Sequence, residues 1–342
     1  MTLAPSPDAN TDVAESGRLS GESLSGLFAR EWYYSIELKP GQISPGAGHP
    51  SVSLTRQLVA RSDVQGARCL DIGCMEGLIS TLMAARGAEV TSIDDKNKVD
   101  QIRAVQSAFG VTFRYLPGIA SMHLLDRLEQ DWNLQYASRD GQRPGSHPDE
   151  RWFDVVVCSG VLYHVWSPLH VLGAARSLVR PGGLLIVETA AIHSPRAAMT
   201  FNFDGTNYIY AHPSNTWFPS DTLLDHQLRM LKLEPLDCVH LGAATPDSVI
   251  RAAIVCRAVD HMPATGAEPD MEAMTRNYEF IDLVPLRHFK GAAGEPVGYR
   301  PGPWKRVMRP DIGTCDVHQT FKAQPQYAPE PSEMVLRLGD VE

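Results

Sequence analysis

The amino-acid sequence predicts an α/β fold in which helices cover a mostly parallel sheet of seven strands with one antiparallel edge hairpin. Between Val64 and Ala258, apolar runs of strand length alternate with amphipathic stretches of helix length, which is the pattern of successive strand–helix–strand units. The last two apolar runs indicate the hairpin. A glycine-bearing turn joins the first strand to its helix. Together these observations indicate a sheet with helices on both faces.

The expected elements follow one another with clear boundary signals. Gly87 ends the first helix, since glycine favours the left-handed conformation found there. Ser220 caps the last helix through its hydroxyl group. In chain order we expect strand 67–72, helix 78–86, strand 89–93, helix 98–109, strand 111–116, strand 153–159, helix 169–179, strand 184–189 after a turn at 181–183, helix 220–230, and strands 236–241 and 249–257.

Four segments are expected to lie outside this core. Residues 1–21 are polar and lack a basic segment followed by an apolar one, so they indicate a disordered lead-in rather than a signal peptide. Residues 22–63 are expected to form an N-terminal helical cap before the main domain, 64–258. The polar stretch within 121–151 indicates a surface insertion. Residues 259–342, rich in Pro and Gly, are expected to form an irregular C-terminal extension.

Charge and hydropathy argue against two classes of partner, nucleic acids and membranes. The chain carries 31 Lys and Arg against 40 Asp and Glu, a net charge of −9, whereas nucleic-acid binders usually present a basic surface. No run of 18 apolar residues predicts a membrane span. We therefore expect a small-molecule substrate. A homodimer is the possible oligomeric state. The one locally basic stretch is expected to be a solvated surface; it contains Arg287, Lys290, Arg300, Lys305, Arg306 and Arg309.

Six cysteines are present and none forms a CxxC pair. Most lie in apolar runs that resemble buried strands, so we expect neither a disulfide framework nor a metal site. This cysteine usage predicts a reducing, cytoplasmic location.

The segment Leu70-Asp-Ile-Gly-Cys-Met-Glu-Gly77 carries the strongest signal for a ligand. A glycine directly after a strand lets the backbone turn tightly and lets a ligand approach closely, and the next helix presents free N–H groups. The spacing of Gly73 and Gly77 differs from the G-x-G-x-x-G of dinucleotide folds. It suits a ligand with an amino-acid tail and no phosphate, although a purely structural turn has the same pattern.

An acid at the end of the second strand supports a nucleoside ligand. Asp94 lies where a carboxylate can accept both ribose hydroxyls, and Asp95 beside it is the competing candidate. A solvated loop acid is the structural alternative for either residue.

Three segments give the chain a family resemblance. The most specific is Gly160-Val-Leu-Tyr-His164 followed by Ser167-Pro-Leu169, and it accompanies 70–77 and 187–189. Together they resemble the tRNA wobble-uridine carboxymethyltransferases and their methyltransferase relatives over residues 27–257. The resemblance implies a Rossmann-like class I methyltransferase fold and S-adenosyl-L-methionine, or a close derivative, as cofactor. The positions that match the family's cofactor and reaction residues are Asp71, Gly73, Gly77, Asp94, Gly118, Ile119, Ser159, Gly160 and Tyr163.

The chain departs from the family pattern at two places. Met75 stands where many methyltransferases have a second glycine, so the turn must pass the cofactor differently. The tRNA carboxymethyltransferases hold the carboxylate of their cofactor with an N-terminal lysine, and here the matching region offers only Lys39, outside that motif. Plain S-adenosylmethionine is therefore favoured over its carboxy derivative.

Tyr163, His164 and Glu188 are the candidate reaction residues, because they end strands where such a site must lie. Methyl transfer requires alignment of the reactants and, for some acceptors, removal of a proton. His164 suits the base, since imidazole titrates near neutral pH, or it bonds the loop backbone instead. Tyr163 is expected to face the methyl group or to pack under the substrate. Glu188 is expected to orient a ligand or to accept a helix-end hydrogen bond.

Two aromatic segments complete the candidate site. Trp32 and Tyr33 are expected either to cover the cofactor, with a cation–π contact to the sulfonium, or to anchor the N-terminal segment. The stretch between the fifth strand and the last helix is where a substrate lid is expected, with Asn207, Tyr208 and His212 as candidates, unless these residues are core.

The sequence therefore predicts a biosynthetic methyltransferase that acts on a small molecule, with specialised metabolism as the expected setting. A tRNA-modifying enzyme, an intramolecular cyclisation of S-adenosylmethionine and a non-catalytic cofactor-binding protein are the alternatives left open. A nicotinamide oxidoreductase is disfavoured by the glycine spacing.

Overall fold

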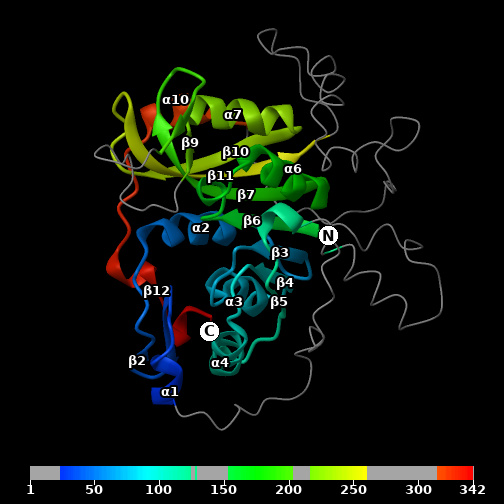
Figure 1. Ribbon diagram of the computed structural model, residues 1–342, viewed down its shortest axis with the longest axis vertical. Helices are drawn as coiled ribbons and strands as arrows, with labels where there is room; N and C mark the ends of the chain where they lie inside the picture. The colour runs from blue at the N-terminus through cyan, green and yellow to red at the C-terminus, as the bar shows by residue number, and fades with distance from the viewer. Residues whose placement is uncertain (1–23, 125–127, 129–152, 203–215, 260–313, 342) are drawn as a thin grey trace, which may run out of the picture.

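The computed structural model describes residues 24–124, 128, 153–202, 216–259 and 314–341 (Figure 1). Its centre is a seven-stranded sheet with the spatial order β10-β11-β7-β6-β3-β4-β5. The strands are β3 (Arg68–Ile72), β4 (Glu89–Asp94), β5 (Arg114–Pro117), β6 (Phe153–Ser159), β7 (Val179–His193), β10 (Leu233–Leu241) and β11 (Ser248–Ala258).

Five neighbouring strands, from β5 to β7, run parallel to one another. β11 pairs antiparallel with both β7 and β10, which confirms the predicted edge hairpin. With the strands numbered in chain order from β3, the order read from the β5 edge is 3-2-1-4-5-7-6. This topology confirms the predicted Rossmann-like class I methyltransferase fold.

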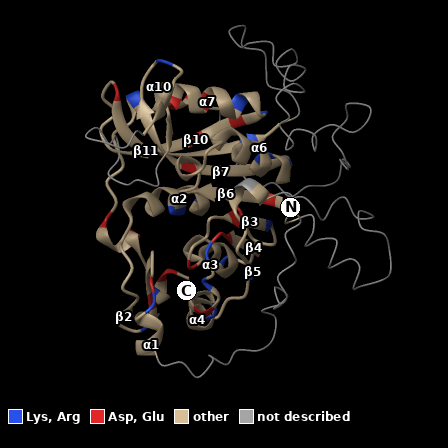
Figure 2. Cartoon of the chain, viewed as in Figure 1, with Lys and Arg blue, Asp and Glu red and all other residues tan. Residues whose placement is uncertain are grey.

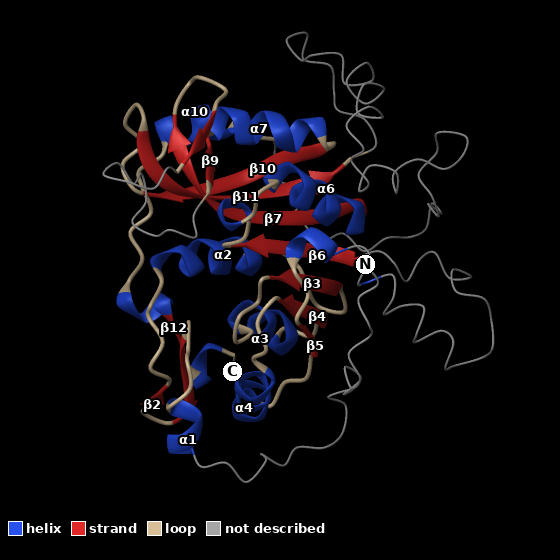
Figure 3. Ribbon diagram, viewed as in Figure 1, coloured by secondary structure: helices blue, strands red, loops and turns tan. Residues whose placement is uncertain are grey.

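Helices cover both faces of the sheet (Figure 3). One face packs against α2 (Pro50–Ala60), α3 (Leu78–Ala85) and α4 (Val99–Phe109), and the other against α6 (Pro168–Leu178), α7 (Asp221–Met230) and α10 (Val317–Ala323). Successive strand residues point to opposite faces. In β6, accordingly, Val155 and Val157 enter the first hydrophobic cluster, and Val156 and Cys158 enter the second.

The predicted helix boundaries agree with the structure. The Ser220 hydroxyl accepts a hydrogen bond from the Leu223 N–H and caps α7. Gly87 adopts φ +82° one residue beyond Arg86, which caps α3, and its N–H donates to the Ala84 carbonyl. The predicted turn at 181–183, by contrast, lies inside β7, which begins at Val179 and shifts register against β6 there.

The two terminal segments correct the sequence-based expectation. Within the predicted helical cap, 22–63, the described residues form strands as well as helices: α1 (Leu24–Phe28) and α2 flank β1 (Ser35–Lys39) and β2 (Gln42–Ile43). The described part of the C-terminal extension is not irregular throughout. After α10 it forms β12 (Val335–Leu336), which pairs parallel with β1, between the 3-10 turns η5 (Pro331–Met334) and η6 (Leu338–Asp340). A two-residue strand has no periodicity from which to predict it.

Two features of the described chain concern partners. Basic and acidic positions are interspersed along the helices and strands, so none of the described elements presents a continuous basic face (Figure 2). None of the helices described is long and apolar enough to cross a membrane.

Candidate active site

The carboxyl ends of β3 and β4 hold the glycine turn predicted from the sequence. Gly73 has φ +78°, and a Cβ atom there would lie 2.5 Å from Val161 Cγ2. Gly77 has φ +77°, and its Cβ would lie 2.8 Å from the Phe113 ring. Both glycines are therefore required by conformation and by space. Met75 between them adopts φ +49°, a conformation that glycine favours.

Asp94, the last residue of β4, closes this turn. Its Oδ2 accepts the Met75 N–H at 2.7 Å and its Oδ1 accepts the Lys96 N–H at 2.8 Å. Burial raises the pKa of the Asp94 carboxyl to about 6. Each carboxylate oxygen still has a lone pair for a further donor. Asp95 has a side chain that is 61% exposed, so Asp94 is the acid built into the turn.

Asp71 lies on β3 beneath the same turn and is 2% exposed. The Ser80 hydroxyl donates to its Oδ2 at 2.6 Å, and Ser80 accepts in turn from the Ser92 hydroxyl. Burial raises the pKa of Asp71 to about 7 against the lowering effect of the Ser80 hydrogen bond, and the Asp94 charge raises it further. No Lys or Arg forms an ion pair with either aspartate within the described residues.

Gly118 and Ile119 follow β5 and lie beside the second-strand acid. Gly118 adopts φ +71°, and the Ile119 N–H donates to the Asp94 carbonyl at 2.9 Å. The structure thus brings these two predicted residues to the same edge of the sheet as the glycine turn.

Glu76, inside the turn, is a residue that the sequence analysis missed. Its carboxylate is fully buried and accepts the backbone N–H groups of Tyr33 at 2.9 Å and Tyr34 at 3.1 Å. Lys98 Nζ lies 2.9 Å from the same carboxylate. Glu76 therefore fastens the N-terminal segment to the turn. The sequence did contain a signal for this role. A glutamate in a turn that is expected to be buried must find hydrogen-bond donors or a positive partner, because a buried charge needs partners.

The two N-terminal aromatic candidates occupy different surroundings. The Trp32 indole N–H donates to the Leu27 carbonyl at 3.0 Å, and its ring packs edge-on against Phe28 in the core, which agrees with an anchoring role. Tyr33 instead stacks on His49, with ring centroids 4.0 Å apart and planes 13° apart. Burial and the charge of Arg251 lower the pKa of His49. The stacked Tyr33 and His49 rings therefore lie within the electrostatic reach of Arg251.

Glu188 and Arg251 form a second buried group, on β7 and β11. Arg251 Nε and Nη2 donate to the two Glu188 carboxylate oxygens, each at 2.7 Å. Glu188 is 1% exposed. A bidentate pair of this kind fixes both side chains. Arg251 was also missed, although an arginine within an apolar strand signals a buried anionic partner.

Tyr163 and His164 form the 3-10 turn η3 (Leu162–His164) that follows β6. The Arg251 guanidinium carbon lies 4.5 Å from the centre of the Tyr163 ring, a cation–π distance. Burial raises the pKa of Tyr163 to about 12. The His164 side chain is exposed, with its ring centroid 4.1 Å from that of Tyr163.

Ser159 and Gly160 join these groups. The Ser159 hydroxyl lies 2.8 Å from the Thr55 hydroxyl of α2 and donates to Glu188 Oε2 at 3.4 Å. Gly160 adopts φ +73°, and its N–H donates to the Glu188 carbonyl at 3.0 Å. The predicted reaction residues of β6 and β7 therefore form one connected group.

The predicted lid falls partly outside the described residues. Asn207, Tyr208 and His212 lie there and stay predictions. The described flanks are β8 (Met199–Phe201) and β9 (Trp217–Pro219), which pair antiparallel. The Thr216 N–H donates to the Tyr163 carbonyl at 2.7 Å, so this segment is attached to the predicted reaction residues.

Comparisons with known proteins show the family of the chain. Residues 51–229 match the model of the methyltransferase domain. The chain is 35% identical to the ubiquinone biosynthesis O-methyltransferase of Aeromonas salmonicida (strain A449) over 185 residues, which is 53% of this chain and 63% of that protein. It is 31% identical to the protein of the same name from Bordetella avium (strain 197N) over 215 residues, 61% of this chain and 74% of that one.

The shared region is a part of each protein. The chain spans between about half and two thirds of the length of the first curated relatives that it matches. A solved structure of the Burkholderia thailandensis 1,6-didemethyltoxoflavin-N1-methyltransferase has a TM-score of 0.39 and 18% identity over 62% of this chain and 78% of that one. The matched family model, which spans the glycine turn, Tyr163 and Glu188, identifies the chain as a member of the methyltransferase domain family.

Proposed function

We propose that this chain transfers the methyl group of S-adenosylmethionine to a hydroxyl oxygen of a small-molecule acceptor. The observation that carries the proposal is that the Gly73–Gly77 turn and Asp94 lie at the carboxyl ends of the parallel strands, as do Tyr163 and Glu188. The relatives named as ubiquinone biosynthesis O-methyltransferases support oxygen as the acceptor atom. A ring compound with a free hydroxyl group is accordingly the acceptor class to examine first.

The residues at the turn fit this cofactor. Gly73 and Gly77 adopt positive φ values and leave no room for a Cβ atom, which keeps the turn between β3 and α3 tight. Asp94 retains lone pairs for the two ribose hydroxyls. Asp71 lies within the same group as a further acceptor. When bound, S-adenosylmethionine supplies a methyl carbon activated by its sulfonium.

Tyr163, Glu188 and Arg251 are suited to aligning the acceptor with the cofactor rather than to forming bonds with it. Arg251 holds the Tyr163 ring from one side, so this ring is a rigid wall against which an acceptor can be oriented. Glu188 is committed to Arg251 through both oxygens and is not available as a base. His164, exposed beside Tyr163, is the candidate that removes the proton of the acceptor hydroxyl.

The test is an assay with methyl-labelled S-adenosylmethionine on the full chain, with a panel of hydroxylated ring compounds and bulk tRNA as parallel acceptors. We expect label in a hydroxylated compound and an equal amount of S-adenosylhomocysteine. His164→Gln should lower kcat by about 10²- to 10⁴-fold, the usual contribution of a general base. His226→Gln is the matched control, because His226 lies on α7 outside the group.

Three results would overturn the proposal. Label in tRNA that depends on Tyr163 would favour the RNA-modifying alternative. Breakdown of S-adenosylmethionine without any acceptor would favour intramolecular cyclisation. Binding of S-adenosylhomocysteine with no turnover across the panel would indicate a non-catalytic protein.

A further inference from the structure

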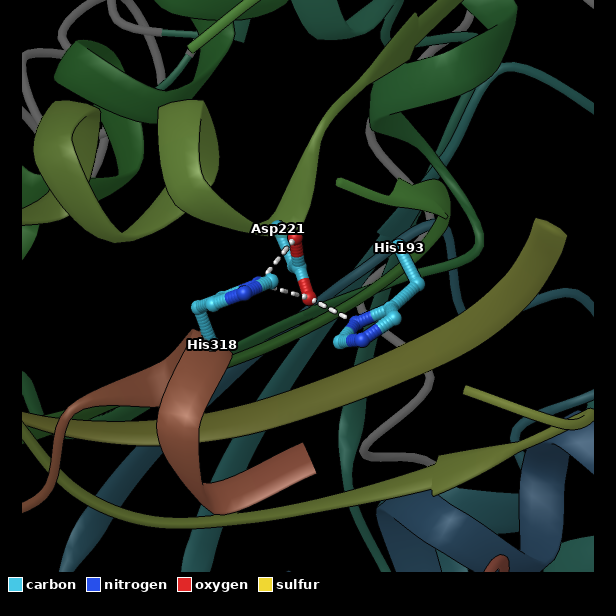
Figure 4. Close-up of side chains that lie close together, drawn as sticks. All are labelled: His193, Asp221 and His318. Atoms are coloured by element: carbon cyan, nitrogen blue, oxygen red, sulfur yellow. Dashed lines mark hydrogen bonds and ion pairs between the residues drawn. The ribbon is translucent and has the colours of Figure 1, made fainter. Parts of the chain in front are cut away.

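A second cluster of polar side chains lies beyond the active-site group. His193 is the last residue of β7, Asp221 is the first residue of α7, and His318 belongs to α10 in the C-terminal segment. Their ligand atoms all lie within 4.8 Å of one another. His193 and Asp221 are buried, and His318 is partly buried. Figure 4 shows the three side chains converging from three separate elements.

The two oxygens of the Asp221 carboxylate have different hydrogen-bond partners. Oδ1 accepts the backbone N–H groups of Ser194 at 3.0 Å and Thr222 at 2.9 Å, which fix the orientation of the carboxylate. Oδ2 faces Nδ1 of His193 at 2.5 Å and Nδ1 of His318 at 3.2 Å. His318 Nδ1 lies 3.2 Å from Oδ1 as well.

The two imidazole rings are held parallel. Their centroids are 4.6 Å apart and their planes differ by 15°. Each ring presents its Nδ1 atom to the Asp221 carboxylate. In the described part of the chain no Lys or Arg forms an ion pair with Asp221. A fully buried carboxylate needs a positive partner or strong donors.

We propose that His193, Asp221 and His318 bind a divalent transition-metal ion of the zinc class. Two imidazole nitrogens and one carboxylate oxygen are a donor set for such ions, whereas Mg²⁺ and Ca²⁺ prefer oxygen ligands alone. An ion would bind the two Nδ1 atoms in their unprotonated form and place a positive charge beside the buried Asp221 carboxylate. The Ser194 and Thr222 N–H groups then hold the non-coordinating oxygen, as outer partners of metal ligands do.

Two adjustments are required. A coordinated imidazole holds the ion close to its own ring plane, so one of the two parallel rings must rotate out of the stack. Zinc binds nitrogen and oxygen at about 2.0–2.2 Å, so ligand atoms in a tetrahedral site lie roughly 3.3 Å apart. His318 Nδ1 is already at this distance from the Asp221 oxygens. The His193–Asp221 distance must lengthen by somewhat less than about 1 Å, and a solvent molecule is the expected fourth ligand.

The position of the cluster gives the ion a structural role. His193 directly precedes segment 194–220, which contains β8 and β9, and Asp221 directly follows it. A bound ion therefore joins the two ends of the predicted lid segment. It also fastens α10, from beyond the matched methyltransferase domain, to the base of that segment. The cysteine spacing gave no sign of this site, because its ligands are distant in sequence and contain no sulfur. The inference does not depend on the proposed function.

The test is calorimetric titration of Zn²⁺ into the chelator-treated full chain under reducing conditions. We expect one saturable equivalent, accompanied by a rise in Tm, because a ligand that binds the folded state alone stabilises it. His318→Gln and Asp221→Asn should each weaken this binding by at least about 100-fold, since loss of an outer partner alone costs 10- to 100-fold. His226→Gln on α7 should leave the affinity within about twofold.

A second measurement needs no variant. X-ray absorption of the zinc-loaded chain should show nitrogen and oxygen neighbours at about 2.0–2.1 Å and no sulfur at about 2.3 Å, which excludes the free cysteines as ligands. Absence of a saturable equivalent would overturn the proposal and leave the cluster as a hydrogen-bonded triad. Sulfur neighbours, or affinity unchanged in a folded His318→Gln variant, would overturn it equally.

Discussion

The two buried aspartates beside the glycine turn and the buried Glu188 are held in opposite ways, whereas Glu76 within the turn is paired with Lys98. On the β3–β4 side, Asp71 and Asp94 are held by hydroxyl and backbone N–H donors, and burial raises the pKa of both. On the β6–β7 side, Glu188 is neutralised by a bidentate bond from Arg251. Both sides lie at the carboxyl end of one sheet, so the difference comes from the side chains and not from the fold.

This difference indicates different tasks. An acid held by neutral donors keeps lone pairs for the neutral hydroxyl and amino groups of a ligand, and its charge responds to that ligand. An acid with both oxygens committed to a guanidinium is a fixed structural element. Asp94 is thus suited to binding, while Glu188 with Arg251 is suited to holding Tyr163 in place.

The largest expected effect comes from breaking the paired side. Glu188→Gln leaves the Arg251 guanidinium buried without an anion, and we expect a loss of about 3–5 kcal/mol in the free energy of unfolding, measured with urea at pH 7. Glu89→Gln, at an exposed position of β4, should change it by less than about 0.5 kcal/mol.

A double variant sharpens this test. Glu188→Leu combined with Arg251→Met replaces the pair by apolar side chains of similar size, and most of the lost stability should return. If the double variant is instead as unstable as the sum of the two single variants, the pair does not act as a unit and the proposed contrast fails.

The next effect is on cofactor affinity. Asp94→Ala removes the acceptor for the ribose hydroxyls and should weaken binding of S-adenosylhomocysteine by about 1–3 kcal/mol, the cost of leaving buried polar groups unpaired. Asp95→Ala is the matched control and should leave the dissociation constant within about twofold, since its side chain is exposed. The reverse ranking in isothermal titration would show that the neighbouring acid binds the ribose.

The pH dependence of binding follows from the same residue. The pKa of Asp94 is raised to about 6, and hydroxyl donors favour the ionised form. Affinity for S-adenosylhomocysteine should therefore rise by at most about tenfold per unit from pH 5 to 6 and level off above pH 7. Asp71 titrates in the same range, so Asp94→Asn is the variant that isolates the contribution of Asp94. A wild-type profile that is flat from pH 5 to 7 would contradict this assignment.

How far the sequence predicts this site depends on the range of the interactions. Gly73, Gly77 and Asp94 were predictable because a strand, a turn and a helix start are local patterns. Arg251 as the partner of Glu188 was not, since the contact depends on the pairing of β7 with β11. The parallel pairing of β1 with β12 joins segments about 300 residues apart, and so short a strand as β12 leaves no periodic signal.

The smallest expected effect is the same carboxylate-to-amide change on the unpaired side. The pKa of Asp71 is about 7 in the folded chain against an ordinary value of 3.8. The folded state therefore binds this proton more tightly than the unfolded state, and stability falls as pH rises from about 4 through 7. Asp71→Asn has no charge to desolvate, and its amide oxygen can still accept the Ser80 hydroxyl. We therefore expect no loss of stability at pH 7 and a flatter stability profile between pH 4 and 7, measured by urea unfolding, because the amide removes the charge that burial disfavours. A loss as large as that of Glu188→Gln would mean that Asp71 has a positive partner after all, and the contrast between the two aspartates and Glu188 would not hold.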